Sequence, residues 1–165
     1  MSKGTSIRRM QINLLSASQV EEYENALHDL MRICLDASFA SHISDGFIAE
    51  KLAALKGYLE AGKAYLFAAF HEEQMLGFLW GCRLESITGP VFHVLYFAVY
   101  PQYRAQGIGR ALLHAAEEKA ADDGIPEMEL LVSDRNDAAK AFYVNHDYGV
   151  TRYTMRKTIK GKRLP

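Results

Sequence analysis

Two glycines and two arginines stand close together in the segment YPQYRAQGIGRALL, residues 100–113. Arg104 precedes Gly107 and Gly109, and Arg110 follows them. An apolar run leads into this segment and a helix-like run leaves it, so its backbone N–H groups are expected at the positive end of a helix. Glycine lets an anion approach the backbone, and arginine adds charge-assisted hydrogen bonds. The segment therefore predicts a loop that holds a phosphate-bearing ligand.

Two other nucleotide-binding motifs do not fit this loop. A Walker A loop has Lys and then Ser or Thr after its last glycine, whereas this chain has Arg110 and Ala111. A dinucleotide-binding loop has Gly or Ala three positions after its second glycine and follows the first strand. Here that position is Leu112, and the loop follows the fourth expected strand. A tight turn between a strand and a helix also produces Gly-X-Gly, and the spacing alone leaves that alternative open.

The elements that position the loop follow from hydrophobic periodicity. We expect strands over residues 6–14, 64–71, 75–84, 91–99, 128–132 and 150–159, and helices from Ser18 through Cys34 and over residues 45–61, 108–123 and 137–145. This order predicts an α/β protein of the α+β kind, with one mixed sheet and helices on both faces. No repeat or linker interrupts the chain, so residues 1–165 are expected to form a single domain.

Side-chain patterns predict where the helices begin and which side each one buries. Ser18 is the expected N-cap of the first helix, with Glu21 as its reciprocal partner. Gly62 is expected to close the second helix. The expected buried stripes are Tyr23, Leu27, Leu30, Met31 and Cys34 in the first helix, Phe47, Leu52, Leu55 and Leu59 in the second, and Ile108, Leu112, Ala115 and the stem of Lys119 in the third.

Composition and charge narrow the class of partner. The net charge is −1 and the pI is about 6.6, so the chain lacks the basic balance of a nucleic-acid-binding domain. The basic residues at the end, Arg156, Lys157, Lys160, Lys162 and Arg163, are interpreted as a solvated terminus. We therefore expect no nucleic-acid partner.

The cysteines, histidines and apolar runs favour a metal-free cytoplasmic protein. Cys34 and Cys82 have no CxxC partner, which argues against a disulfide scaffold or a thiolate metal site and fits a reducing compartment. The six histidines show no ligand spacing, so we expect no metal. No apolar h-region begins the chain and no stretch is long enough to span a bilayer, so a cytoplasmic location without membrane attachment is expected.

Two motifs give the chain a specific resemblance. Val99-x-Pro-x-x-Arg104-x-x-Gly107-x-Gly109 resembles the acyl-CoA pyrophosphate loop of the GNAT superfamily of N-acetyltransferases. Asn136-Asp-Ala-Ala139-Lys-Ala-Phe142-Tyr143 is similar to the C-terminal motif of that family, at the usual distance downstream. The order of strands and helices also matches, so the resemblance covers nearly the whole chain. It implies a mostly antiparallel central sheet with a splayed strand at the acyl-CoA site.

The resemblance also implies which residues hold acetyl-CoA. Backbone groups of Phe97 and Val99 on the splayed strand would bind the pantetheine arm. The pyrophosphate would lie on the amides of Arg104, Ala105, Gln106, Gly107, Ile108 and Gly109, with Arg110 next to them. Asn136 would hydrogen-bond the cofactor, and its residue type also suits the N-cap of the following helix.

Three groups are implied in the chemistry. The backbone N–H near Phe97 would polarise the thioester carbonyl. Tyr143 matches the family tyrosine that faces the CoA sulfur and acts as general acid; the alternative is core packing beside Phe142. His93 stands where many members carry a glutamate, which makes it the candidate base, and a structural histidine is the alternative. Strand alternation predicts that His93 shares a face with Leu95 and Phe97.

The chain departs from the family pattern in its last part. Asp147 replaces the glycine that usually follows the tyrosine by four residues, a position that aspartate tolerates. The segment 149–159 is short for a full final hairpin, which suggests either a more open acceptor side or one completed by a second subunit in a homodimer. The entrance would lie at residues 37–47, where Phe39, His42, Asp45 and Phe47 are candidate acceptor contacts.

The resulting functional hypothesis is an N-acetyltransferase that moves an acetyl group from acetyl-CoA to a primary amine by direct transfer in a ternary complex. A small amine, an amino sugar, an antibiotic and a protein amine all remain open as acceptors. The alternative is a non-catalytic acyl-CoA-binding or regulatory module on the same fold. Both hypotheses need the loop from Arg104 to Gly109, but only the enzyme needs Tyr143.

Overall fold

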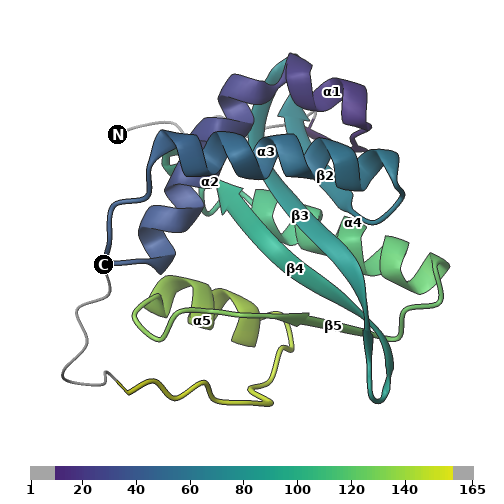
Figure 1. The fold of residues 1–165 in the computed structure, drawn as a ribbon, viewed down its shortest axis with the longest axis vertical. Coiled ribbons are helices and arrows are strands. Elements are labelled where there is room, and N and C mark those ends of the chain that lie inside the picture. Colours follow the sequence, from purple (N-terminus) through teal and green to yellow (C-terminus); the bar gives the residue numbers. More distant parts are fainter. Residues whose placement is uncertain (1–9, 158–165) are drawn as a thin grey trace, which may run out of the picture.

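A computed structural model describes residues 10–157 of the chain (Figure 1). The strands are β1 (Met10–Leu14), β2 (Tyr65–His71), β3 (Gln74–Ser86), β4 (Gly89–Val99) and β5 (Glu127–Leu130). They form one sheet in the order β1-β2-β3-β4-β5. The first four strands pair antiparallel, and β5 pairs parallel to β4. The mixed, mostly antiparallel sheet predicted from the sequence is confirmed.

Helices cover both faces of this sheet (Figure 1). They are α1 (Ala17–Glu22), α2 (Glu24–Ser38), α3 (Asp45–Glu60), α4 (Ile108–Asp122) and α5 (Asp137–Val144), with a short 3₁₀ helix, η1, at Pro101–Tyr103. One hydrophobic core lies between the sheet and α1, α2 and α3, and a second lies between the sheet and α4. Because strand side chains alternate, neighbouring residues of β2 divide between the cores: Leu66 enters the first and Phe67 the second.

The first helical segment begins two residues earlier than predicted and is divided. Ser16 rather than Ser18 is the N-cap, and its backbone N–H donates to the Gln19 side-chain oxygen at 2.9 Å, which replaces the expected Glu21 contact. Tyr23, at φ −105° and ψ 18°, separates α1 from α2. Serines two positions apart are equally good caps by type, so the sequence did not distinguish them.

The buried faces of two helices are rotated from the predicted ones. In α3 the core residue is Ile48, fully buried, whereas the predicted Phe47 is 37% exposed. In α4, Leu113, Ala116 and Ala120 join the buried side, while the predicted Ala115 is only half-buried. Adjacent helix positions differ by about 100° around the axis, so a shift of one residue changes which side meets the sheet. Gly62, at φ +66°, closes α3 as predicted.

The predicted last strand is not formed in the described part of the chain. Residues 150–157 have no strand partner, and their apolar side chains are exposed, Tyr153 to 88% and Met155 to 94%. Consequently β5 is the edge of the sheet, and it ends at Leu130, two residues before its predicted end. A strand needs a neighbour to pair its backbone, which alternation in sequence does not guarantee. Residues 6–9 and 158–159 of the predicted terminal strands lie outside the described residues.

A bulge in β4 reverses the faces on which its side chains lie. Trp80 pairs with Tyr96 and the next residue of β3, Gly81, pairs with Val94, so Leu95 is an extra residue in β4. Val94 belongs to the core under α4, while Tyr96 packs against the core under α2 and α3. An extra residue therefore interrupts the alternation between the two halves of β4.

This bulge makes the predicted shared face of His93 and Phe97 wrong. His93 pairs with Cys82, on the side of the sheet that α2 and α3 cover, whereas Phe97 packs against the core under α4. The prediction from alternation assumed that β4 pairs with its neighbour without an extra residue. The sequence of β4 carries no glycine at the bulge that would have signalled it.

Candidate active site

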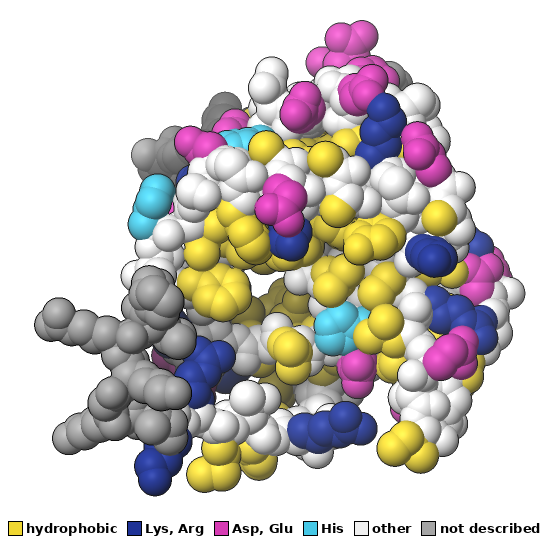
Figure 2. Space-filling model, viewed as in Figure 1, with side chains coloured by type: hydrophobic (Ala, Val, Ile, Leu, Met, Phe, Trp, Pro, Cys, Tyr) yellow, Lys and Arg dark blue, Asp and Glu magenta, His cyan; other side chains and the backbone are white. Residues whose placement is uncertain are grey.

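A cavity of about 580 Å³ opens where the bulged end of β4, the glycine loop, α5 and the last turn of α2 meet. Figure 2 shows the molecule hollowed in this region, with apolar side chains around the hollow. The described lining residues are Ile33, Cys34, Ala37, Ser38, Val94, Leu95, Phe97, Ala98, Val99, Tyr103, Arg104, Ala105, Gly107, Ile108, Gly109, Arg110, Leu130, Leu131, Val132, Asn136, Ala138, Ala139, Phe142, Tyr143 and His146. They include two arginines and, in this described set, no carboxylate. The cavity thus suits a long, partly apolar, anionic ligand.

The loop after β4 presents backbone N–H groups to this cavity. Ala105 (φ 58°) and Gly107 (φ 82°) both adopt left-handed conformations, and Gly107 is the N-cap of α4. Successive residues of this kind turn N–H groups toward one side and form a concave anion site at the start of a helix. The Arg104 Nε donates to the Val99 carbonyl at 3.2 Å, which ties the loop to the end of β4. Loops of this kind, with left-handed residues at the start of a helix, bind phosphate groups in proteins.

A glycine is required at each of the two loop positions for a different physical reason. Gly107 has a positive φ, a conformation that L side chains rarely adopt. Gly109 lies inside α4, where a Cβ would approach the Phe142 ring to 3.3 Å and the Phe97 ring to 3.5 Å. The second glycine therefore lets α4 pack closely against α5 and β4. Only the first shapes the loop itself.

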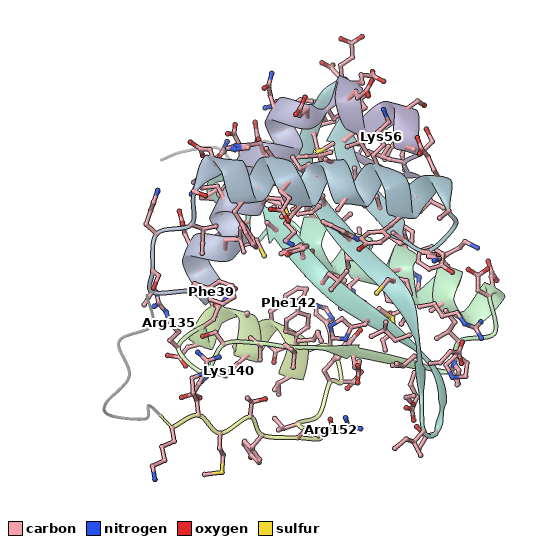
Figure 3. All side chains as sticks on the ribbon, viewed as in Figure 1. Phe39, Lys56, Arg135, Lys140, Phe142 and Arg152 are labelled. Carbon is pink, nitrogen blue, oxygen red and sulfur yellow. The ribbon has the colours of Figure 1, made fainter. Side chains whose placement is uncertain are left out.

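Tyr143 lies in the cavity within a cluster of aromatic rings. Its ring centroid is 5.3 Å from that of Phe142, 5.5 Å from Tyr148 and 6.4 Å from Phe97. Figure 3 shows Phe142 directed from α5 toward β4. Burial, with smaller contributions from Cys34 and Tyr148, raises the pKa of the Tyr143 phenol well above its ordinary value. Tyr143 therefore keeps its proton at neutral pH, and its hydroxyl is able to donate a hydrogen bond.

Asn136 begins the helix that carries Tyr143. Its side-chain oxygen accepts a hydrogen bond from the Ala139 N–H at 3.1 Å, which caps α5. The side-chain NH₂ of a capping asparagine remains available as a donor, and Asn136 lines the cavity. The residue thus has the capping role expected from its type.

His93 lies outside the lining of this cavity and pairs with an acid that the sequence analysis did not identify. The His93 Nδ1 is 3.0 Å from the Glu129 Oε1, across the parallel pair β4–β5. The His93 side chain is 15% exposed and the Glu129 side chain 44%. A carboxylate at Nδ1 fixes the ring and leaves Nε2 as the second functional nitrogen. Strand register alone brings these residues together, so neither motif nor spacing signalled it.

Cys34 is a second cavity residue that the sequence interpretation assigned only to packing. It lies on α2 and is half-buried. Burial raises the pKa of its thiol, and the backbone amide of Phe97 offsets part of that rise. Its helical spacing with Leu27 and Leu30 indicated a core stripe, which concealed its position at the cavity.

The four predicted acceptor residues are not among the lining residues of the cavity. Phe39, 54% exposed, follows the end of α2 at the mouth of the cavity (Figure 3). The Asp45 carboxylate accepts a hydrogen bond from Arg32, and the Phe47 ring lies 4.9 Å below the Lys51 ammonium. His42 is exposed. Of the candidate segment 37–47, Ala37 and Ser38 line the cavity.

Over residues 10–157, no group of three or more His, Cys, Asp or Glu side chains is arranged to hold a metal ion. Within the same range, the helices are too short or too polar to cross a membrane.

A family model and curated relatives match the chain. The model of the Acetyltransferase (GNAT) family matches residues 25–148. An "Acetyltransferase" from Yersinia pestis (strain Pestoides F) is 35% identical over 88 residues, which cover 53% of this chain and 60% of that protein. The match therefore spans less than two thirds of that relative's length.

Solved structures share the fold over a larger part of the chain. A "Putative acetyl transferase from Pyrococcus furiosus" has a TM-score of 0.71 and 26% sequence identity, covering 92% of this chain and all of that one. The aminoglycoside N-acetyltransferase AAC(6')-Iy, in complex with CoA, has a TM-score of 0.73 and 16% identity, covering 93% and 96%. The chain and these proteins have the same strand and helix arrangement.

The cap of α5 gives a prediction about the helix that carries Tyr143. Asn136→Ala removes the acceptor for the Ala139 N–H and should lower the free energy of unfolding by about 1 kcal/mol. Asn136→Asp keeps a capping oxygen and should retain most of the stability. Urea denaturation of the three proteins measures both effects. Equal stability of the Ala and Asp variants would contradict the capping role.

Proposed function

The chain belongs to the GNAT acetyltransferase family, and from this premise we propose that it transfers an acetyl group from acetyl-CoA to a primary amine by direct transfer in a ternary complex. The observation that carries the proposal is one cavity that joins the glycine loop to Tyr143. The loop supplies an anion site, and Tyr143 supplies a protonated phenol at the other end.

The cofactor is proposed to run along β4 from the loop to Tyr143. Amides from Ala105 through Gly109, with Arg110, hold the pyrophosphate. The Arg104 amide, expected from the sequence to join them, instead donates to the Pro101 carbonyl at 3.3 Å. Backbone groups of Phe97 and Val99 face the pantetheine arm, as the splay of β4 leaves part of its edge unpaired: β5 ends at Leu130, opposite Val94. The Asn136 amide donates to the cofactor.

Two residues act on the thioester in this proposal. The reaction breaks the thioester C–S bond and forms an amide C–N bond, with a proton lost from the amine and one gained by the CoA sulfur. The Phe97 N–H stabilises the developing negative charge on the carbonyl oxygen. The Tyr143 hydroxyl donates to the departing sulfur, and its raised pKa keeps that hydroxyl protonated until then.

Direct transfer is favoured over an acyl-enzyme on Cys34. Attack on the thioester requires a thiolate. Burial raises the pKa of the Cys34 thiol, so the thiol stays protonated at neutral pH. Cys34 is therefore not assigned the role of a nucleophile, although it borders the reacting groups.

His93 is proposed as the base that takes the proton of the amine. Glu129 orients the imidazole through Nδ1, which leaves Nε2 to accept a proton directly or through water. His93 does not line the cofactor cavity, so the acceptor is expected on the side of β4 that faces α2 and α3. Glu129 acts as a positioning residue.

The acceptor is proposed to be a primary amine that reaches the cofactor from the side of β4 where His93 pairs with Glu129. AAC(6')-Iy, which shares the fold, is an aminoglycoside N-acetyltransferase. An acyl-CoA-binding module without activity is the alternative that the next variant tests.

The Tyr143→Phe variant separates the enzyme from the binding module. Loss of the hydroxyl removes the donor to the sulfur and should lower kcat for the best amine of an acceptor panel at least about 100-fold. The affinity for acetyl-CoA, measured by calorimetry, should change little because the ring remains. A Tyr143→Phe protein with full turnover would exclude Tyr143 from the mechanism, and absence of turnover in the original chain would favour the module.

The base is tested by a pair of variants with a matched control. His93→Gln should lower kcat at neutral pH about 100-fold or more, since general-base catalysis contributes about 10²–10⁴-fold. Glu129→Gln should lower kcat less, and Glu129→Asp should restore part of the loss. His114→Gln, on the exposed face of α4, is the control and should leave kcat unchanged. Full activity of His93→Gln would refute the assignment.

Two glycines with the same backbone conformation test the anion site. Gly107 (φ +82°) begins α4 and Gly124 (φ +68°) follows its end. Alanine at either position should cost about 1–2 kcal/mol of stability through backbone strain. Only Gly107→Ala should also weaken CoA binding, by about tenfold, as loop amides move away from the phosphates. Calorimetry and urea denaturation measure the two effects, and equal CoA affinity of both variants would contradict the site.

A further inference from the structure

The last turns of α2 form the wall of the cavity that faces β4 and α5. Ile33, Cys34 and Ala37 contribute this wall, and Phe97 and Tyr143 lie among the residues that complete the lining. Ala37 is small and Ile33 belongs partly to the core under α2 and α3. Cys34 carries the sulfur atom of this wall, and its side chain is half-buried.

The packing around Cys34 places it next to the bulged end of β4. Cys34 and Tyr96 both pack against the core under α2 and α3, and Tyr96 and Phe97 are the first residues of β4 after the bulge. Cys34 lines the same cavity as Phe97 and Tyr143. It therefore borders the cavity that contains the proposed carbonyl site, at the Phe97 N–H, and the proposed sulfur site, at the Tyr143 hydroxyl.

We propose that Cys34 limits the size of the acyl group that the cavity accepts, by filling the space next to the thioester carbonyl. This inference rests on the proposed function. A carbonyl carbon held between the Phe97 amide and the Tyr143 hydroxyl directs its remaining substituent away from both groups. The α2 wall at Cys34 borders that space, so an acetyl methyl fits where a longer chain meets the sulfur.

In this proposal the volume of the Cys34 side chain, rather than the reactivity of its thiol, limits the acyl group. A thiol that stays protonated and half-buried behaves as a small apolar group. Pockets distinguish ligands by one methylene with a factor of about 10–200, because the cavity resists enlargement. Removal of the sulfur atom should therefore weaken the discrimination between acetyl and propionyl groups, whereas a serine of similar size should preserve it.

Binding of an acyl-CoA series tests the inference without knowledge of the acceptor. Calorimetry gives the Kd of acetyl-, propionyl- and butyryl-CoA for the original chain and for Cys34→Ala, Cys34→Ser and Cys82→Ala. Cys82 is half-buried on β3 and is not among the lining residues, which makes it the matched control. We expect the propionyl-to-acetyl Kd ratio to fall about tenfold in Cys34→Ala and to stay within about twofold in the other two variants.

The outcomes separate this inference from the function on which it rests. Tight binding of acetyl-CoA with the same ratio in Cys34→Ala as in the original chain would overturn the role of Cys34 alone. A ratio that falls equally in Cys82→Ala would also overturn it, since the effect would then be general. Absence of binding to every CoA species by the original chain would overturn both proposals. Thermal unfolding of each variant confirms that the compared proteins are folded.

Discussion

The extra residue in β4, Leu95, is the constraint on which the site depends. It reverses the alternation of the strand between Val94 and Tyr96, so that His93 and Phe97 lie on opposite sides of the sheet. It also lies where β5 stops pairing, since the last paired residue of β4 is Val94. A bulge twists a strand and interrupts its ladder. Beyond it β4 still pairs with β3, but its other edge no longer pairs with β5 and is open to a ligand, with one reacting group expected from each side.

Close packing of α4 and α5 supports the part of β4 that lies beyond Leu95. Gly109 lets α4 approach the rings of Phe97 and Phe142, and Phe142 in turn lies beside Tyr143. The anion site at the start of α4 and the phenol on α5 are therefore held by one aromatic cluster rather than by separate loops. Asn136 secures the start of α5. Rigid placement of this kind matters because reacting groups must be oriented to within fractions of an ångström.

The sequence predicted most of the architecture, because the long periodic segments of α3, α4 and β2 are locally unambiguous. It failed where two choices are chemically alike, as with Ser16 and Ser18, or where a shift of one residue changes the buried side, as with Phe47 and Ile48. The final strand failed for another reason: its pairing depends on a neighbour that residues 150–157 do not have in the described chain.

The site was predicted only in part for a related reason. Gly107, Arg104, Asn136 and Tyr143 stand in motifs whose order along the chain is informative, and the structure brings them to one cavity. Cys34 reaches this cavity through helix packing, and Glu129 reaches His93 outside it through strand register; both join segments far apart in sequence. The bulge had no sequence signal, because Leu95 is an ordinary strand residue.

A crystal structure of the chain with bound CoA tests the central claim most directly. The account predicts the pyrophosphate on the amides between Arg104 and Arg110, the pantetheine arm along β4 beyond Leu95, and the sulfur between Phe97 and Tyr143. CoA bound elsewhere, or with its sulfur remote from Tyr143, would contradict the account, and the cavity would then need another ligand.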